Sequence, residues 1–509
     1  MKKDIEKYKI YSNEVEAEIT IAETDTEYIP LYELKKRKIS LGIQVVLDEV
    51  KEELIKVVPL STKEFIDPKV FEGVKTKFRE KAIDLLENYF PNLAEKEKRF
   101  LACGLVNDML GLGDIELILS DPNLEEIVVN CHREPIWVYH KRHNWLKTNI
   151  YLDNEEEIYN YSSAIGRRVG MQISNLHPLM DAHLTTGDRV NATIFPISTK
   201  GNTITIRKFS RSPWTIIHFL EAKTFSKDVA AFLWLAIQYE LNIMVSGGTA
   251  SGKTSMLGVI LPFIPPNQRI ISIEDTREIQ LPDFLHWVPL SSRGSNPEGK
   301  GEITMLDLMV NALRMRPDRL IIGEIRRAKE AEVMFEAIRT GHSAYATFHG
   351  DRADQVFKRL TNSPINLAES MLSALHLIVV QYRHRRKGIR RTTEVAEIIS
   401  TEDKCRVNII YRWNAQTDQI EKINEVYRIY DEISMYSGMT KKEIETDIAN
   451  KVVILDWMMK HKIKTVNSVG KILAEYYQDE KKIIKAAVGN ISPKEILGEK
   501  LYGEIIKSD

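Results

Sequence analysis

The chain has 509 residues, of which 43% are hydrophobic and 28% are charged; at roughly 100–200 residues per domain, this corresponds to about three globular domains. The net charge of −1 gives no overall basic field, so we expect no nucleic-acid partner. The longest apolar run, Val229 to Ile237, is much shorter than the ~20 residues of a spanning helix, which predicts a cytoplasmic chain without a membrane span.

Neither the cysteines nor the N-terminus indicates a secreted protein. Cys103, Cys131 and Cys405 are far apart in sequence and form no C-x-x-C pair. This pattern is typical of reduced structural thiols in a cytosolic protein, and it disfavours a zinc site. Lys2 and Lys3 are followed by further charged residues, so the N-terminus does not resemble a signal peptide.

The N-terminal part is predicted to contain helices and then strands. Residues 10–29 carry six acidic and no basic residues but alternate with apolar ones, which fits either an edge strand or a solvated, partner-binding arm. Residues 68–120 have apolar side chains at helical spacing, with a break at Pro91. Strand-like alternation from 121 to 209, interrupted by one helix near 155–170, predicts a compact α+β domain.

A complete phosphate-loop motif follows a short apolar strand at residues 241–246. The pattern G-x-x-x-x-G-K-[ST] occupies 247–254, and the next residues can begin a helix. Loop N–H groups and a helix N-terminus bind anions, Lys253 can reach the β- and γ-phosphates, and the Thr254 hydroxyl can bind Mg²⁺. The predicted nucleotide site consists of Gly247, Gly248, Thr249, Ala250, Ser251, Gly252, Lys253, Thr254 and Ser255.

Short apolar strands alternate with helical segments around this motif. We predict strands at 243–246, 269–273, 320–323 and 344–347, which indicates an α/β sheet with parallel strands. The divisions that we predict are 1–67 (N-terminal arm and small subdomain), 68–209 (helical plus α+β domain), 210–213 (linker), 214–430 (nucleotide-binding domain) and 431–509 (C-terminal helical region).

Two further segments of the C-terminal half leave alternatives open. Residues 377–399 are typical of a hairpin, and its basic tip at 383–391 fits either a solvated turn or a docking patch. Residues 430–509 have a helical pattern, and these helices could cap the sheet or form a small appended bundle.

An apolar strand at 319–323 ends in Glu324. A parallel strand beside the phosphate loop would place its C-terminal end at the γ-phosphate. Glu324 could there polarise a water molecule for in-line attack or act through Mg²⁺. The alternative is a helix-capping role, because a helix could begin at 325–327.

A second acidic cluster and a pair of histidines complete the candidate chemistry. Glu274 and Asp275 end another strand and could lie near a metal, with Arg277 paired to one of them, or the segment could be a solvated loop. His342 and His349 flank a strand and are an odd number of residues apart, which argues against a shared metal. One histidine could act as a sensor or hydrogen-bond donor near the phosphates, although a structural role is common.

Taken in chain order, the phosphate loop, the strand that ends in Glu274, the strand that ends in Glu324 and the histidine segment resemble the Walker A, Asp, Walker B and His boxes of the type II/type IV secretion-system ATPases. They resemble the archaeal branch of this family most closely. The similarity covers roughly residues 120–430 and is specific as a set. The tetracysteine zinc module of the bacterial assembly motors is absent, which fits the archaeal branch. Further segments that resemble this branch are 121–127, 177–182, 187–192, 205–209 and 316–326.

The resemblance implies an α/β, RecA-like P-loop ATPase domain, preceded by an α+β N-terminal domain and followed by C-terminal helices, in a homohexameric ring. It implies ATP and Mg²⁺ as cofactors, with the metal held by Thr254 and, in part through water, by Glu274. It assigns catalytic roles to six side chains: Glu324 as the catalytic carboxylate, Glu274 as the Asp-box acid, Arg189 and Arg207 as arginine fingers, and His342 and His349 as the His box.

The implied function is a motor that assembles an archaellum, a type IV pilus-like filament or a type II-like secretion system. Such a motor lies at the inner face of the cell membrane, bound to a polytopic platform protein and to the machinery that exports filament subunits. Three alternatives stay open: a pilus-retraction or DNA-transfer motor, a nucleic-acid translocase, and an ATP-gated scaffold without hydrolysis. The near-neutral charge disfavours the translocase.

Overall fold

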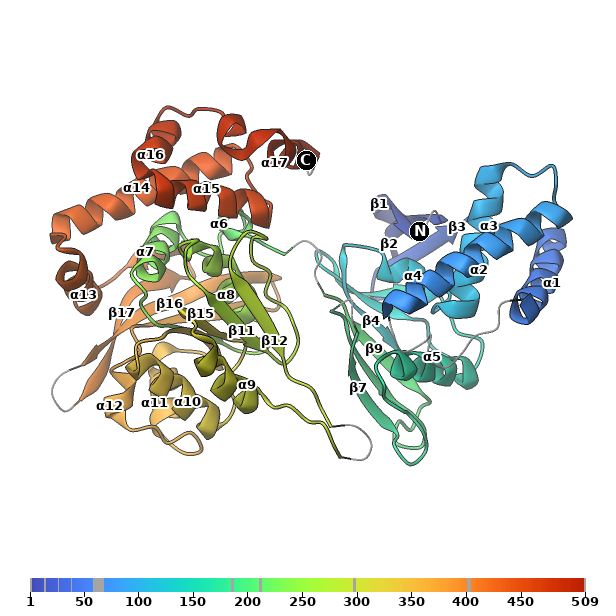
Figure 1. The fold of residues 1–509 in the computed structure, drawn as a ribbon, viewed down its shortest axis with the longest axis horizontal. Coiled ribbons are helices and arrows are strands. Elements are labelled where there is room, and N and C mark those ends of the chain that lie inside the picture. Colours follow the sequence, from blue (N-terminus) through green and yellow to red (C-terminus); the bar gives the residue numbers. More distant parts are fainter. Residues whose placement is uncertain are drawn as a thin grey trace. The chain divides into compact units, whose positions relative to one another are not determined.

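The chain folds into two compact units, each with its own sheet (Figure 1). The first comprises Met1–Arg211 with Ser295–Lys300, and the second comprises Ser212–Gly294 and Gly301–Asp509. Residues 210–212 of the predicted linker lie outside the described part of the chain, and the predicted domain boundaries stay predictions. The computed structural model describes residues 2–12, 15–25, 27–37, 39–57, 68–184, 187–209, 213–295, 299–400 and 404–507.

The sheet of the first unit has nine strands in the order β1-β2-β3-β6-β5-β4-β9-β8-β7. Strands β3 and β6 are parallel, and the other neighbours are antiparallel. The strands are β1 (Lys2–Ser12), β2 (Val15–Thr24), β3 (Leu31–Lys36), β4 (Leu124–Val129), β5 (Trp137–His140), β6 (Asn144–Thr148), β7 (Leu179–His183), β8 (Arg189–Thr193) and β9 (Thr203–Arg207).

Half of the acidic N-terminal stretch, Val15–Thr24, forms strand β2. Ala17 and Ile19 are buried while Glu16 and Glu18 are exposed, so the alternation in the sequence matches the two faces of the sheet. Because β2 pairs with β1 on one side and with β3 on the other, Val15–Thr24 is an interior strand, and neither of the two alternatives, an edge strand or a solvated arm, describes it.

The helices of the first unit follow the predicted pattern between 68 and 120. α2 ends at Tyr89, just before Pro91, and α3 begins at Glu95. Phe78 and Leu86 of α2 share an apolar core with Val50 of α1. The helices are α1 (Leu41–Val57), α2 (Pro68–Tyr89), α3 (Glu95–Leu110), α4 (Asp114–Leu119) and α5 (Glu155–Arg168).

The sheet of the second unit has the order β12-β11-β13-β14-β10-β15-β16-β17-β18. The strands from β12 to β15 are parallel to their neighbours, and those from β15 to β18 are antiparallel. The strands are β10 (Ile243–Gly247), β11 (Ile270–Glu274), β12 (Trp287–Ser291), β13 (Arg319–Ile322), β14 (Ser343–His349), β15 (Leu377–His384), β16 (Ile389–Ser400), β17 (Cys405–Asn414) and β18 (Gln419–Lys422).

Helices cover both faces of this sheet. Ile243 and Val245 of β10 belong to one apolar core and Met244 to another, which is why the strand is a continuous apolar run. The helical elements are α6 (Ile216–Glu221), α7 (Lys227–Gln238), α8 (Lys253–Ile260), the 3₁₀-helix η2 (Leu261–Phe263), α9 (Met305–Ala312), the 3₁₀-helix η3 (Leu313–Met315), α10 (Ala328–Arg339), α11 (Ala353–Thr361), α12 (Glu369–Leu372), α13 (Arg428–Ser437), α14 (Lys441–Lys460), α15 (Val466–Gln478), α16 (Glu480–Val488) and α17 (Lys494–Lys507).

Three strands of this sheet, β12, β17 and β18, were not predicted, because their sequences lack a clear apolar pattern. β12 is half-exposed along most of its length and contains Pro289, which an edge strand tolerates. β18 has four residues that are largely exposed, so it carries almost no apolar signal. The mixed burial of β17 similarly weakens its alternation. β17 and β18 follow the predicted hairpin of β15 and β16, and together with β16 they extend the parallel sheet by antiparallel strands, whereas β12 is parallel to β11 at the other edge.

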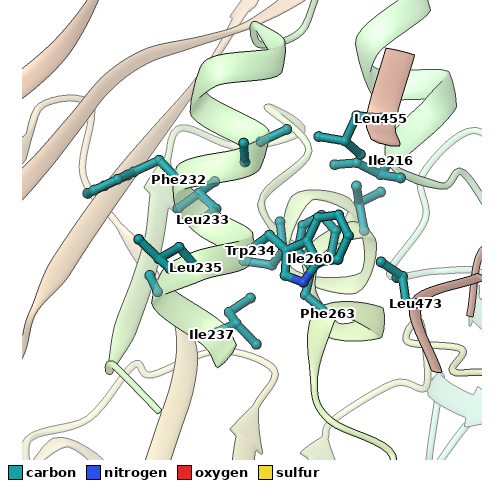
Figure 2. Packing of buried hydrophobic residues seen from close by; sticks show 14 of the residues in the cluster. Ile216, Phe232, Leu233, Trp234, Leu235, Ile237, Ile260, Phe263, Leu455 and Leu473 are labelled. Carbon is teal, nitrogen blue, oxygen red and sulfur yellow. The ribbon is translucent and has the colours of Figure 1, made fainter. Parts of the chain in front are cut away.

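The C-terminal helices join the core of the second unit and do not form a separate bundle. Trp234 of α7 stacks on Phe263 of η2 with ring centroids 5.2 Å apart, and Tyr476 of α15 meets the indole edge-on. Figure 2 shows Trp234 and Phe263 in this core, to which Leu455 and Leu473 of the C-terminal helices also belong. Among the described residues, no helix is both long and apolar enough to cross a membrane.

Candidate nucleotide-binding site

The phosphate loop joins β10 to α8 at the carboxyl edge of the parallel strands. β10 lies between β14 and β15, and the chain leaves it toward β11 on one side before it later returns as β15 on the other. Such a change of direction forms a crevice in which α/β proteins bind ligands. The N-terminus of α8 directs its partial positive charge into this crevice.

Two glycines are required by the backbone of the loop. Gly247 has φ of 149°, and a Cβ there would lie 2.2 Å from the carbonyl oxygen of Gln381. Gly252 has φ of 91° at the residue before α8, in the left-handed region. The loop therefore turns tightly at both ends.

Lys253 is buried inside the loop, where its ammonium meets three polar groups. Nζ donates to the carbonyl oxygen of Gly248 at 3.3 Å and lies 3.4 Å from Nδ1 of His349. It also lies 3.9 Å from Oε1 of Glu324. Burial lowers the pKa of Lys253, and the charge of Glu324 opposes this shift. A polyphosphate would give this buried cation stronger anionic partners.

Glu324 follows β13 and is held by cationic and hydrogen-bonding side chains. Its Oε1 lies 2.8 Å from Nε2 of His349, and its Oε2 lies 2.6 Å from the guanidinium of Arg326. Glu324 does not cap the next helix, because the carboxylate of Glu330 accepts the N–H groups of Arg326 and Arg327 before α10. β14 separates β13 from β10, so the strand that ends in Glu324 is not the direct neighbour of the phosphate-loop strand that we expected.

His349 and His342 lie at opposite ends of β14. Gly247 and His349 are paired in register across β10 and β14, which brings His349 to the loop. His342 precedes the strand, roughly 20 Å away at the other edge, where its ring meets the carbonyl oxygen of Ala337. Within one chain, the structure therefore does not bring His342 into the candidate site, which corrects the expectation of two site histidines.

The hydrogen bonds of His349 indicate which tautomer it adopts. Burial and the nearby charge of Lys253 lower the pKa of the imidazole, so the ring is neutral at pH 7. Lys253 can only donate to Nδ1, which leaves the ring proton on Nε2 to be donated to Glu324. His349 thus links the phosphate-loop lysine to the carboxylate.

Glu274 ends β11 as a buried carboxylate. Its Oε1 accepts the backbone N–H groups of Glu278 and Ile279 at 2.9 and 3.1 Å, whereas Oε2 has no hydrogen-bond partner among the described residues. Burial raises the pKa of Glu274 to about 7. Asp275 pairs with Arg326, which also holds Glu324, and not with Arg277, which lies over the indole ring of Trp287.

These residues are compatible with Mg²⁺, although the described part of the chain holds no cluster of three or more histidine, cysteine, aspartate or glutamate ligands. Mg²⁺ is usually held by few protein groups together with substrate phosphates and water. The hydroxyl of Thr254 lies in the first turn of α8, and the unpartnered Oε2 of Glu274 is the kind of acceptor that a metal-bound water needs.

Replacing Glu274 with glutamine should remove a pH dependence of stability. The raised pKa means that the wild type gains stability from protonated Glu274 below about pH 4.5 and loses it as the pH rises through about 7, by about 3 kcal/mol in total. Urea unfolding without nucleotide, at about pH 5 and about pH 8, measures how the free energy of unfolding changes with pH in the wild type and in the variant. Glu332→Gln on α10 is the control, and an unchanged pH dependence in Glu274→Gln would contradict the assignment.

The two predicted arginine fingers lie in the first unit, on neighbouring strands β8 and β9. Arg189 and Arg207 are directly paired in register, and Arg207 is also opposite Glu126 of β4. Arg189 binds Asp181 through Nε at 2.9 Å and Nη2 at 2.5 Å. The two arginines are thus direct neighbours on adjacent strands of the sheet. That they contact a nucleotide is a proposal.

The sequence pattern of the family described as "Type II/IV secretion system protein" matches residues 167–483, which is more than half of the chain. The chain belongs to this family. The family resemblance inferred from the four motifs is therefore confirmed, and the matched range contains the phosphate loop and all the residues around it. The match also includes the strands that carry Arg189 and Arg207.

Relatives of this secretion-system protein occur in archaea and bacteria. "Uncharacterized protein MJ0900" of Methanocaldococcus jannaschii is 33% identical over 483 residues, which cover 90% of this chain and 86% of the relative. The type IV secretion system protein PtlH of Bordetella pertussis is 29% identical over 307 residues, which cover 54% of this chain and 89% of the relative.

Two solved structures are similar as well. The VirB11 ATPase of the Brucella suis type IV secretion system is 26% identical, with 54% of this chain and 93% of that chain covered and a TM-score of 0.28. The Legionella pneumophila ATPase DotB is 17% identical, with 73% and 93% covered and a TM-score of 0.41. These scores are too low to support an argument, so the α/β fold rests on the strand order and the phosphate loop described above.

Proposed function

We propose that this secretion-system family member is a motor ATPase that drives assembly of an archaellum, a type IV pilus-like filament or a type II-like secretion system. The observation that carries the proposal is the contact of Lys253, His349 and Glu324 at the edge of the sheet, beside a complete phosphate loop. A binding-only scaffold would need the loop and its lysine, but it would not need a carboxylate held at this position.

The proposed reaction is hydrolysis of ATP to ADP and phosphate. The loop amides and Lys253 bind the β- and γ-phosphates, while Glu324 orients a water molecule and accepts its proton as the water oxygen attacks the γ-phosphorus. The bond from that phosphorus to the β–γ bridging oxygen breaks, and its electron pair stays with ADP. Mg²⁺, held by Thr254 and through water by Glu274, would neutralise the phosphate charges. Neutral His349 donates to Glu324 and keeps the carboxylate beside the lysine.

The proposed assembly is a homohexamer in which each site is completed by a neighbour. Arg189 and Arg207 would reach the nucleotide of the adjacent subunit, where a guanidinium can bind phosphate oxygens with two hydrogen bonds. Nucleotide binding would favour a closed arrangement of the two units, and hydrolysis would favour an open one. This motion would be transmitted to a polytopic platform protein at the inner face of the cell membrane and to the machinery that exports filament subunits.

A DNA-transfer motor is a second candidate because of one relative. "Putative conjugal transfer protein Rv3659c" of Mycobacterium tuberculosis is 28% identical over 324 residues, which cover 61% of this chain and 90% of the relative. Hydrolysis stimulated by DNA would favour this candidate. Stimulation by the cytoplasmic part of a platform protein would favour filament assembly.

Mixing two inactive variants tests the shared site. Arg207→Ala subunits retain Glu324, and Glu324→Gln subunits retain Arg207, so an equal mixture should recover about a quarter of wild-type hydrolysis if sites form between neighbours at random. Light scattering on the same samples establishes whether rings form.

Lys253→Ala mixed with Glu324→Gln is the matched control. Both of these residues belong to the same chain's site, so no combination of subunits can restore a complete site. If mixed rings of Arg207→Ala and Glu324→Gln subunits recover no hydrolysis at any mixing ratio, the shared-site arrangement is excluded.

A further inference from the structure

The hairpin of β15 and β16 extends past the end of the phosphate-loop strand. Gly247, the last residue of β10, is paired with Gln381, and β15 continues from there to His384. The carbonyl oxygen of Gln381 lies close above Gly247, where only a glycine fits. The base of the basic hairpin is therefore built against the loop.

Arg390, a basic residue of the hairpin, contacts the loop. Its Nε donates to the carbonyl oxygen of Ala250 at 3.4 Å. Its Cδ lies 3.4 Å from the position that a Cβ on Gly252 would take. Ala250 has φ of 59°, a left-handed conformation that is uncommon for alanine. The side chain of Arg390 thus lies along residues 250–252 of the phosphate loop.

The neighbouring basic residues have other environments. Arg391 is buried and binds both carboxylate oxygens of Asp418, and it also donates to the carbonyl oxygen of Ala222. Arg385 and Arg386 lie in the exposed turn of the hairpin. Because successive residues of a strand point to opposite faces, Arg390 faces the loop while Arg391 supports the sheet.

We infer that Arg390 is a nucleotide-binding residue that acts on the site of its own subunit. This inference rests on the proposed function, in which the loop binds ATP. A guanidinium has five N–H donors in a planar fork, so its bond to Ala250 leaves the Nη groups able to bind phosphate oxygens. Arg390 thereby adds a cation to the rim of the loop from the second unit, whereas Arg189 and Arg207 belong to the first.

Affinity for ATP in three full-length variants tests this role. Arg390→Ala should weaken ATP binding by about tenfold or more, Arg390→Lys should retain part of the affinity, and the matched control Arg386→Ala should match the wild type. Isothermal titration with ATP gives the Kd, and thermal unfolding without nucleotide should give the same Tm for all of them. A Tm that falls for Arg390→Ala together with a normal affinity at lower temperature would show a structural role only and would overturn the inference.

The oligomeric state separates this role from that of the first-unit arginines. In samples dilute enough for light scattering to show monomers, Arg390→Ala should still weaken binding, while Arg207→Ala should not. An effect of Arg390→Ala that appears only in rings would overturn the same-subunit assignment. Wild-type protein that does not bind ATP would overturn the proposed function itself, whereas normal affinity in Arg390→Ala beside lost affinity in Lys253→Ala would overturn only this inference.

Discussion

Replacing Glu324 with glutamine should lower the rate of ATP hydrolysis by about a thousandfold while the affinity for ATP stays within a few-fold of the wild type. Glutamine has nearly the same shape as glutamate but cannot accept a proton from water. The buried Lys253 and the loop amides, which would hold the phosphates, are not altered. Steady-state kcat and the Kd for ATP, measured on the same preparation, separate the two effects.

The surroundings of Glu324 make this experiment specific. Arg326 and His349 both bind the carboxylate, so a variant that lost the fold of this edge would also lose nucleotide affinity. Glu336→Gln, at an exposed position of α10, removes a carboxylate without touching the site and should behave as the wild type. Hydrolysis at the wild-type rate in Glu324→Gln would exclude Glu324 as the base.

Replacing Lys253 with alanine should weaken ATP binding by about a hundredfold or more. The ammonium is buried in the loop and is the cation nearest to where the phosphates would lie, and charge-assisted hydrogen bonds to several phosphate oxygens would be lost together. Isothermal titration with ATP and with ADP measures the loss. We expect hydrolysis to become undetectable because little ATP is bound.

Stability without nucleotide should change little in this variant. Burial disfavours the charged form of Lys253, because its ammonium is desolvated in the folded protein. Removing the ammonium therefore also removes this desolvation cost. Lys358→Ala, at an exposed position of α11, is the control for removal of a positive charge. An ATP affinity in Lys253→Ala equal to that of the wild type would refute the assignment of the phosphate loop.

Four of the parallel strands of the second sheet could be predicted from local sequence alone. The strands β10, β11, β13 and β14 are apolar runs, because each is buried on both faces, and such runs are visible in the sequence without knowledge of their neighbours. The phosphate loop was predictable for a related reason. Its glycines satisfy the backbone of one short turn, so their spacing is a local requirement.

Strand order and the partners of polar side chains were not predictable in this way. Nothing local places β14 between β10 and β13, and that order is what brings His349 to the loop and leaves His342 at the far edge. The pairing of Asp275 with Arg326 in place of Arg277 also joins residues on different strands. β12 and β18 were missed because exposed strands carry a weak apolar signal.

The sequence by itself therefore determined the family, the phosphate loop and the carboxylates that end the strands, because these depend on short segments whose backbone and burial are set by neighbouring residues. Only the tertiary structure decided which distant side chains meet at the loop. Lys253 lies beside His349, 96 residues away, and Ala250 accepts a hydrogen bond from Arg390, 140 residues away. Contacts at such separations depend on strand order, on register and on which face each side chain takes, and these are properties of the assembled sheet.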